Sequence, residues 1–169
     1  DDGSTDGTGA LLDWYAAEHP QIIAIHQPNG GVTSARLAAL KQATGDYIGF
    51  VDGDDLVEHE MFQTLIDDAE QYGADIAHCG YQMVFPSGRI DRYYGTGRVV
   101  EQNGETGVLD LIRGDFVEPG LWNKLYRREL IEHFLAEDRM DWTIRINEDL
   151  LMNFLLFSLA KKAVFRDIC

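Results

Sequence analysis

Three short acidic segments hold the residues in this sequence that are most able to do chemistry. The first opens the chain at Asp1-Asp2-Gly3-Ser4, the second is Asp52-Gly53-Asp54-Asp55, and the third is Asn147-Glu148-Asp149. Each segment borders a predicted helix or strand, whose regular backbone can hold a side chain in a fixed direction. These segments are therefore the candidate catalytic, metal-binding and ligand-binding parts of the chain.

The Asp52–Asp55 segment directly follows Tyr47–Val51, whose unbroken apolar character predicts a strand buried on both faces. Ligands of open α/β sheets bind beyond the carboxyl ends of the strands. Carboxylates about 4 Å apart repel by ~4 kcal/mol near a protein surface, and a divalent cation relieves that repulsion. Oxygen ligands favour Mg²⁺, Mn²⁺ or Ca²⁺ over zinc, so the segment predicts a divalent-metal site. The alternative is a solvated acidic loop that caps the next helix.

The opening segment, Asp1–Thr8, contains two glycines and leads directly into a predicted helix. Helix N-termini attract anions, so the segment is compatible with a phosphate nearby. The alternative is a capped helix start without a ligand. Asp2-x-Ser4-x-Asp6-Gly7, with Asp13 six residues after Gly7, also partly matches an EF-hand calcium loop, but the final ligand would be Asp instead of the longer Glu, and no entering helix is present. The glycine spacing matches only part of a dinucleotide fingerprint.

The third segment, Asn147-Glu148-Asp149, precedes Leu150–Phe157, which is apolar almost all round and predicts a buried helix. The helix dipole favours the charged form of acids in the first turn. A carboxylate kept ionised in this way suits a general base, which accepts a proton from an attacking hydroxyl. The alternative is plain capping of the helix by Asn147.

The segments between these acidic motifs alternate between helix and strand patterns, with Gly95–Gly107 as the least patterned region. This order predicts an α/β fold with a mostly parallel, Rossmann-type sheet flanked by helices, and a small antiparallel part in the second half. The expected helices are Thr8–Glu18, Thr33–Ala43 and Glu58–Tyr72, and the expected strands are Ile22–Ile25, Tyr47–Val51, Ile76–Phe85 and, after a turn at Pro86-Ser87-Gly88, Arg89–Tyr94.

Composition narrows the class of protein. A length of 169 residues suits one domain over the whole chain, and the absence of an initiator Met leads us to expect a piece of a longer protein. The net charge of −15 argues against a general nucleic-acid or membrane-surface binder. Two cysteines imply no disulfide framework and favour a reducing compartment such as the cytoplasm. No apolar run is long enough to span a bilayer.

Five motifs, taken in order, resemble the inverting glycosyltransferases of family two, which have a GT-A fold. The resemblance covers nearly the whole chain, and it includes the acidic segments described above. The motifs are Asp1–Thr8, Asn29-Gly30-Gly31 to Ala35-Arg36, Gly45–Ile48 running into Asp52–Asp55, Trp122–Arg128, and Asn147–Leu151.

The resemblance implies transfer of a sugar from a nucleotide-diphosphate sugar, expected to be a UDP-sugar. It places Asp2 against the nucleotide base and Asp52 against the ribose or the donor sugar. Asp54, together with Asp52, would hold Mn²⁺ or Mg²⁺ on the donor diphosphate. Arg36 and Lys124 would assist at the phosphates, with ordinary packing or surface cations as the alternative interpretation.

On the acceptor side, the resemblance implies that Asp149 deprotonates a hydroxyl of a saccharide or lipid-linked saccharide, as in polysaccharide biosynthesis. Glu148 would assist, and Trp122 would stack on the acceptor sugar unless it is a core residue. A base on the opposite face of the sugar ring from the leaving group gives inversion. The reaction would take place in the cytoplasm, or at the inner face of the membrane if parts outside this chain bring the enzyme there. No nucleic-acid partner and no membrane span within this chain are expected.

Two alternatives from other classes stay open. A nucleotidyltransferase also uses paired aspartates and a metal on an α/β sheet, and a non-catalytic module would bind metal or sugar nucleotide without transfer. The sequence also departs from the family pattern. The family's first strand is absent, Leu37 and Ala39 stand where Asn and Gly are usual, and the chain stops at Cys169, before the family's C-terminal strand and helix.

Overall fold

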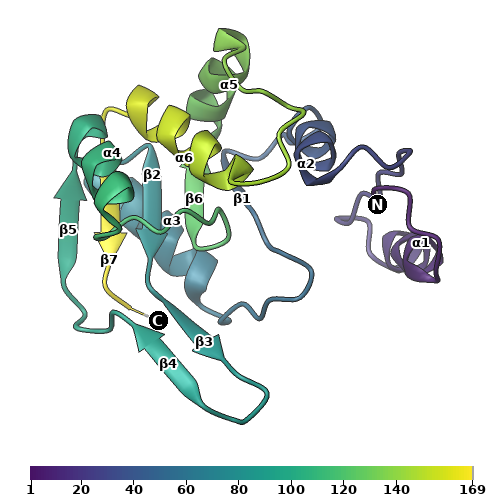
Figure 1. Cartoon of the computed structure of the whole chain (residues 1–169), viewed down its shortest axis with the longest axis horizontal. Coiled ribbons are helices and arrows are strands. Elements are labelled where there is room, and N and C mark those ends of the chain that lie inside the picture. Colours follow the sequence, from purple (N-terminus) through teal and green to yellow (C-terminus); the bar gives the residue numbers. More distant parts are fainter. Residues whose placement is uncertain (169) are drawn as a thin grey trace. The chain divides into compact units, whose positions relative to one another are not determined.

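The computed structural model describes residues 1–168, which form two compact units (Figure 1). The first unit comprises Asp1–Thr44 and the segment Asp141–Glu148. The second unit comprises Gly45–Met140 and the residues from Asp149 onward. Within the described residues, no helix is both long enough and apolar enough to cross a bilayer.

The first unit contains two helices, α1 (Thr8–Glu18) and α2 (Val32–Leu40). The predicted bounds of α1 are confirmed, although none of its residues is buried. In α2 only Thr33 and Leu40 are buried. The Thr33 hydroxyl donates to the carbonyl of Ile144 at 2.6 Å, which ties α2 to the Asp141–Glu148 segment.

The predicted strand at Ile22–Ile25 does not form. Beside it lies a single residue of the opening segment, Asp1, whose N-terminal amine donates to the Ile25 carbonyl at 2.8 Å and whose carbonyl accepts from the Gln27 N–H at 3.0 Å. A strand is stabilised by a ladder of such pairs along a neighbouring strand. One paired residue is too little, so the segment stays extended without becoming a strand.

The second unit contains a five-stranded sheet with the order β1-β6-β2-β7-β5. The pair β2–β7 is parallel, and the pairs β1–β6, β2–β6 and β5–β7 are antiparallel. Three strands, β1, β2 and β7, therefore share one direction. The strands are β1 (Tyr47–Gly49), β2 (Ile76–Cys79), β5 (Val99–Gln102), β6 (Lys124–Arg127) and β7 (Ala163–Arg166).

The predicted α/β class, with helices flanking a sheet in which most strands run one way, is confirmed. The hydrogen-bonded neighbours are nevertheless more often antiparallel than the sequence indicates, because β6 lies between β1 and β2 and runs against both. The predicted antiparallel part is confirmed as a separate hairpin of β3 (Tyr81–Val84) and β4 (Ile90–Tyr93). Its turn contains the expected Pro86–Gly88 segment, with Gly88 at φ 83°.

The single strand predicted over Ile76–Phe85 is divided at Gly80, where β2 ends and β3 begins in a different sheet. A Cβ at Gly80 would lie 2.5 Å from the Tyr93 carbonyl oxygen and 2.6 Å from that of Ile168. The chain can therefore pass from one sheet to the other only because this residue has no side chain.

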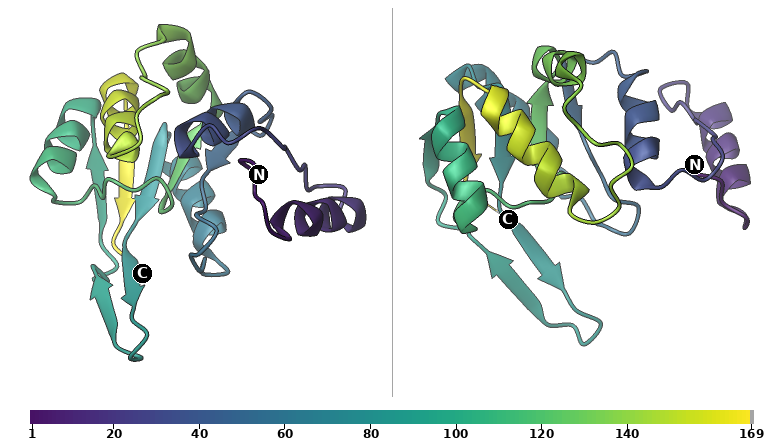
Figure 2. Two further views of the ribbon diagram at one scale, coloured as in Figure 1. Left: turned by 45° about the vertical axis from the view of Figure 1, so that its right-hand side comes forward. Right: turned by 45° about the horizontal axis from the view of Figure 1, so that its top comes forward.

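Helices cover both faces of the five-stranded sheet (Figures 1 and 2). On one face, Leu65 and Ala69 of α3 (Met61–Tyr72) pack in a buried cluster with residues of β2, β6 and β7. On the other face, the ring of His78 lies 5.7 Å from that of Phe157 in α6 (Glu148–Leu159). The helix that follows β6 is α5 (Arg128–Glu137).

The region Gly95–Gly107, the least patterned part of the sequence, holds β5 and the start of α4 (Gly104–Arg113). Asn103 and Thr106 form a capping box, in which each side chain bonds the other residue's backbone N–H. A Cβ at Gly107 would lie 2.3 Å from the Phe157 ring, so α4 and α6 approach closely. Because few residues of this region are apolar, the sequence pattern did not indicate β5. Among the described strands, β5 pairs with β7 alone.

His78 on β2 is a fully buried histidine. Its Nε2 lies 2.8 Å from the Gln102 Oε1, and its Nδ1 has no hydrogen-bond partner among residues 1–168. Burial, and then the positive charge of Lys124, lower the pKa of His78 from 6.5 to about 3. The folded chain therefore keeps this imidazole neutral at pH values where the unfolded chain protonates it.

We expect His78 to make the free energy of unfolding fall with decreasing pH. Between about pH 6 and pH 4 its contribution should decrease by ~1.4 kcal/mol per pH unit, because only the unfolded state takes up the proton. His78→Gln should give a correspondingly shallower pH dependence in urea titrations. The exposed His133→Gln should keep the wild-type slope, and equal slopes for wild type and His78→Gln would contradict the assignment.

Candidate functional site

The predicted site residues are divided between the two units. Asp2, Arg36 and Glu148 belong to the first unit, whereas Asp52, Asp54, Trp122, Lys124 and Asp149 belong to the second. Within the second unit, the termini of three neighbouring strands lie side by side at one end of the sheet. Gly49 of β1 pairs with Leu125 of β6, and His78 of β2 pairs with Lys124. The ends of β1 and β2 therefore lie beside the start of β6, where Trp122 and Lys124 are found.

The Asp52–Asp55 segment forms a four-residue turn just past β1, in which the Asp55 N–H donates to the Asp52 carbonyl at 3.1 Å. Asp52 is partly buried, whereas Asp54 and Asp55 are exposed. Desolvation, followed by the negative charges of Asp52 and Asp54, raises the pKa of Asp55. The folded turn thus keeps Asp55 close enough to Asp52 and Asp54 to be affected by their charges, as the sequence predicts for adjacent carboxylates.

This donor set fits a hard divalent cation, because all of its ligand atoms are oxygens and their charges repel when no cation is bound. Among residues 1–168, however, no three His, Cys, Asp or Glu side chains are grouped so that they could hold an ion. Oxygens from a bound ligand, such as a diphosphate, would have to complete the coordination. This behaviour is typical of Mg²⁺, which is often held by one or two carboxylates together with substrate phosphates.

Lys124 is fully buried at the start of β6. Its ammonium donates to the carbonyls of Glu118 and Gly120, each at 2.6 Å, and to the Asn123 Oδ1 at 2.7 Å. These three acceptors match the three N–H donors of the ammonium. The side chain thus points into the protein and fixes the loop Glu118–Gly120.

The same ammonium connects this loop electrostatically to α6. Burial lowers the pKa of Lys124 to about 7, while the negative charges of Glu118 and Asp149 raise it. The carboxylate of Asp149 therefore lies within the electrostatic reach of a buried cation. Sequence reasoning missed this neighbour, because the basic residue nearest to Asp149 along the chain is Arg145.

Asp149 stands in the first turn of α6, partly buried, and its Oδ1 accepts the N–H of Leu150 at 2.8 Å. Asn147 has φ 58°, in the left-handed region, whereas an N-cap residue usually has an extended backbone. Asn153, one turn further along α6, donates to the carbonyls of Pro119 and Gly120. The loop before β6 is thus bonded from two sides, by Lys124 and by α6.

In the first unit, Asp2 organises the loop before α2. Its carboxylate accepts the N–H groups of Gly30 at 2.8 Å and Gly31 at 2.7 Å, and the side-chain amide of Gln27 at 2.6 Å. The backbone hydrogen bond from Gly30 is the main cause that lowers the pKa of Asp2. Asp2 is therefore ionised at neutral pH and shapes the Gly30-Gly31 turn.

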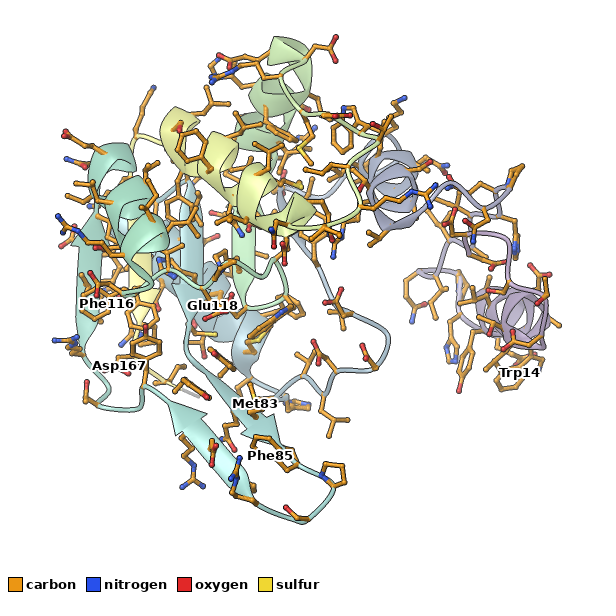
Figure 3. The ribbon with its side chains drawn as sticks, viewed as in Figure 1. Trp14, Met83, Phe85, Phe116, Glu118 and Asp167 are labelled. Carbon is orange, nitrogen blue, oxygen red and sulfur yellow. The ribbon has the colours of Figure 1, made fainter. Side chains whose placement is uncertain are left out.

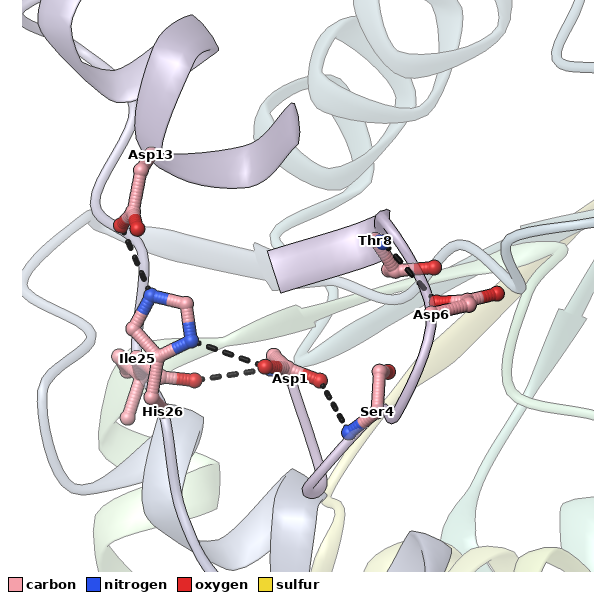
Figure 4. Close-up of polar contacts among 7 residues, drawn as sticks. All are labelled: Asp1, Ser4, Asp6, Thr8, Asp13, Ile25 and His26. Carbon is pink, nitrogen blue, oxygen red and sulfur yellow. Dashed lines mark hydrogen bonds and ion pairs between the residues drawn. The ribbon is translucent and has the colours of Figure 1, made fainter. Parts of the chain in front are cut away.

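The other acids of the opening segment also make contacts within the first unit (Figure 4). The Asp1 carboxylate accepts the Ser4 N–H and lies 2.9 Å from the Nδ1 of His26, whose Nε2 lies 2.9 Å from Asp13. Asp6 accepts the N–H of Thr8, the first residue of α1. These contacts favour the interpretation of this segment as a structured helix start.

Arg36 and Glu148 form an ion pair in the first unit, with the Arg36 Nη1 3.0 Å from the Glu148 Oε1. Both side chains are only 15% exposed, so each charge is largely shielded from water. The sequence assigned these residues to different tasks, at the phosphates and at the base. In the structure they neutralise each other.

Trp122 belongs to an aromatic cluster that sequence reasoning did not identify. Tyr81 of β3 and Tyr93 of β4 stack at 4.6 Å with an interplanar angle of 6°, and Trp122 meets Tyr81 edge-on at 4.9 Å. The two tyrosines are cross-strand partners in the hairpin. The predicted turn at Pro86–Gly88 contained the signal, because it fixes which residues of the two strands face each other.

Comparisons with known proteins bear on the whole chain. The model of a family described as "Glycosyl transferase family 2" matches residues 1–152. EpsJ of Bacillus subtilis, described as an uncharacterized glycosyltransferase, is 38% identical over 168 residues, which are 98% of this chain and 48% of that protein. The cholesterol galactosyltransferase of Borreliella burgdorferi is 30% identical over 174 residues, again 98% of this chain and 48% of that protein.

Solved structures of S. aureus TarS share the fold. The TarS 1–349 complex with UDP-GlcNAc matches with a TM-score of 0.77 and 20% identity, over 99% of this chain and 45% of that chain. The complex with UDP gives the same TM-score of 0.77. The predicted GT-A-like fold is thereby confirmed, and the chain spans about half the length of EpsJ and of TarS 1–349.

We expect Lys124→Met to destabilise the second unit. Methionine has a similar length but no N–H donors, so the buried carbonyls of Glu118 and Gly120 would lose a donor. Each such loss costs about 1–3 kcal/mol, so the free energy of unfolding in urea should fall by about 2–4 kcal/mol. The exposed Lys161→Met is the matched control and should stay within ~0.5 kcal/mol of wild type. A Lys124→Met protein as stable as this control would refute the anchoring contacts.

Proposed function

Because the chain belongs to glycosyl transferase family 2, we propose that it transfers a sugar from a nucleotide-diphosphate sugar, with a UDP-sugar as donor, to an acceptor hydroxyl with inversion. The observation that carries the proposal is the Asp52–Asp55 turn, whose carboxylates repel one another at the sheet edge where β1, β2 and β6 meet. The UDP and UDP-GlcNAc complexes of TarS, which shares the fold, support this choice of donor. The family match favours sugar transfer over nucleotidyl transfer.

On the donor side, Asp54 and Asp52 would hold Mn²⁺ or Mg²⁺ together with the donor diphosphate. When bound, the ion neutralises negative charge on the leaving diphosphate. Asp2, whose carboxylate holds the turn at Gly30-Gly31, would lie against the nucleotide base, as the family resemblance implies. Arg36 would assist at the phosphates only after exchanging its present partner, Glu148.

On the acceptor side, Asp149 would accept the proton of the attacking hydroxyl. The acceptor oxygen forms a bond to the anomeric carbon while the bond from that carbon to the diphosphate breaks, which inverts the anomeric centre. The buried ammonium of Lys124 and the Asp149 carboxylate favour each other's charged forms. Cys79 is a buried thiol outside any disulfide, with its Sγ 3.8 Å from the Asn123 carbonyl oxygen, which is compatible with a reducing compartment such as the cytoplasm.

Binding of UDP should depend on a divalent cation. In titration calorimetry, we expect the affinity for UDP to be about tenfold or more higher with Mn²⁺ than with EDTA, because the cation offsets repulsion between the acidic turn and the diphosphate. Asp54→Asn should reduce this difference strongly. The control Asp67→Asn, an exposed aspartate of α3, should keep it. Equal affinity with and without metal would remove the metal from the proposal.

Asp149→Asn should lower turnover while leaving the donor affinity nearly unchanged. The substitution keeps the shape of the side chain and removes its basicity, and general-base assistance is typically worth ~10²–10⁴ in rate. Transfer rate, UDP affinity and melting temperature should be measured on one preparation. A well-folded variant with the wild-type transfer rate would show that Asp149 is not the base.

A further inference from the structure

Asn153 is a fully buried amide in the middle of the apolar helix α6. Its Nδ2 donates to the carbonyls of Pro119 and, at 3.2 Å, Gly120, and its Oδ1 accepts the Tyr126 hydroxyl at 2.7 Å. Both N–H groups and the oxygen of the amide therefore have a partner. Because an unpaired polar group is costly when it is buried, the amide is stable only where all three bonds form together.

These bonds constrain α6 more tightly than its apolar contacts do. Apolar contacts have no preferred direction and tolerate small shifts, whereas hydrogen bonds weaken steeply when their angles change. A rotation of α6, or a slide along its axis, would disturb the three bonds of Asn153 at once. The buried apolar side chains around it are Met152, Leu155, Leu156 and Phe157.

The partners of Asn153 are themselves held in place. The Gly120 carbonyl also accepts the Lys124 ammonium at 2.6 Å, so it receives one donor from α6 and one from β6. This carbonyl belongs to the loop Glu118–Gly120, whose first residue is labelled in Figure 3. Tyr126 is fully buried in β6, at a position paired with both β1 and β2. Asn153 thus ties α6 to the sheet and to the loop before β6.

The proposed base lies one turn away on the same helix. Asp149 precedes Asn153 by four residues, a spacing that places both on one side of α6. The Asp149 carboxylate accepts the N–H of Leu150 within its own turn, and this bond does not connect it to the sheet. In the second unit, the position of Asp149 therefore follows from where Asn153 holds the helix.

We propose that Asn153 is a positioning residue for sugar transfer, which holds α6 through Tyr126 and the loop Glu118–Gly120 so that Asp149 meets the acceptor hydroxyl. This inference rests on the proposed function, in which Asp149 is the base. Displacement of a reacting group by about 1 Å can cost ~10² in rate. Since Asn153 acts through Asp149, its loss lowers turnover and leaves donor binding unchanged.

Two neighbouring substitutions in α6 test the proposal on the full chain. Asn153→Leu keeps a similar volume and removes all three bonds. The control Met152→Ala removes a buried apolar side chain, which destabilises the protein without touching the amide. Turnover is measured as UDP release from UDP-GlcNAc with Mn²⁺ and water as acceptor, and donor affinity by titration calorimetry with UDP.

We expect Asn153→Leu to lower turnover about 10- to 100-fold per folded molecule and to keep the UDP affinity within about twofold. Met152→Ala should keep the wild-type turnover at a similarly lowered melting temperature. Tyr126→Phe removes one of the three bonds and should lower turnover less, by about threefold, which keeps the proposal testable if Asn153→Leu does not fold. A crystal structure of Asn153→Leu should show the Asp149 carboxylate displaced by about 1 Å.

The proposal is overturned if Asn153→Leu or, in its place, Tyr126→Phe turns over as wild type does. It is also overturned if Met152→Ala loses as much turnover, or if Asp149 keeps its position in the Asn153→Leu crystal. Asp149→Asn separates the two levels. A wild-type rate in Asp149→Asn would refute the base in the proposed function, whereas a slow Asp149→Asn beside an unimpaired Asn153→Leu would refute the positioning role alone. If wild type releases no UDP, the donor proposal is contradicted and the crystal structures decide whether Asn153 holds Asp149.

Discussion

A positive charge inside a protein must find an acceptor for each of its N–H groups, and this requirement organises the second unit around Lys124. Its ammonium uses the carbonyls of Glu118 and Gly120 and the side chain of Asn123. These hydrogen bonds draw the loop before β6 inward and fix where β6 begins. The start of β6 in turn lies beside the carboxyl ends of β1 and β2. The three bonds of this buried cation therefore stabilise the end of the sheet where the acidic turn after β1 lies.

Local sequence patterns were sufficient to predict those elements that are stabilised by contacts between residues near each other along the chain. The apolar spacing of Thr8–Glu18 predicted α1 to the residue, and Gly73, at φ 59°, ends α3 as its sequence position indicates. The acidic turn after Tyr47–Gly49 could be located because a strand and its following turn are adjacent along the chain. The family resemblance added the roles of the site residues, which composition and spacing alone do not assign.

Long-range contacts account for what the sequence did not reveal. The antiparallel insertion of β6 between β1 and β2 joins segments that are distant along the chain, and no local pattern encodes it. The interaction of Lys124 with Asp149 and the pairing of Arg36 with Glu148 arise in the same way. Conversely, Ile22–Ile25 has the composition of a strand, but among residues 1–168 its backbone pairs with Asp1 alone, so strand propensity was not sufficient to form a strand.

Gly80 has a mechanical consequence. The chain leaves the five-stranded sheet and enters the hairpin at this residue, and the carbonyls of Tyr93 and Ile168 close on the space that a Cβ would fill. The absence of one methyl group therefore sets how closely the hairpin approaches the main sheet. Because β2 and β3 are continuous through Gly80, a force applied to the hairpin is carried along the backbone into the centre of the sheet, without an intervening flexible linker.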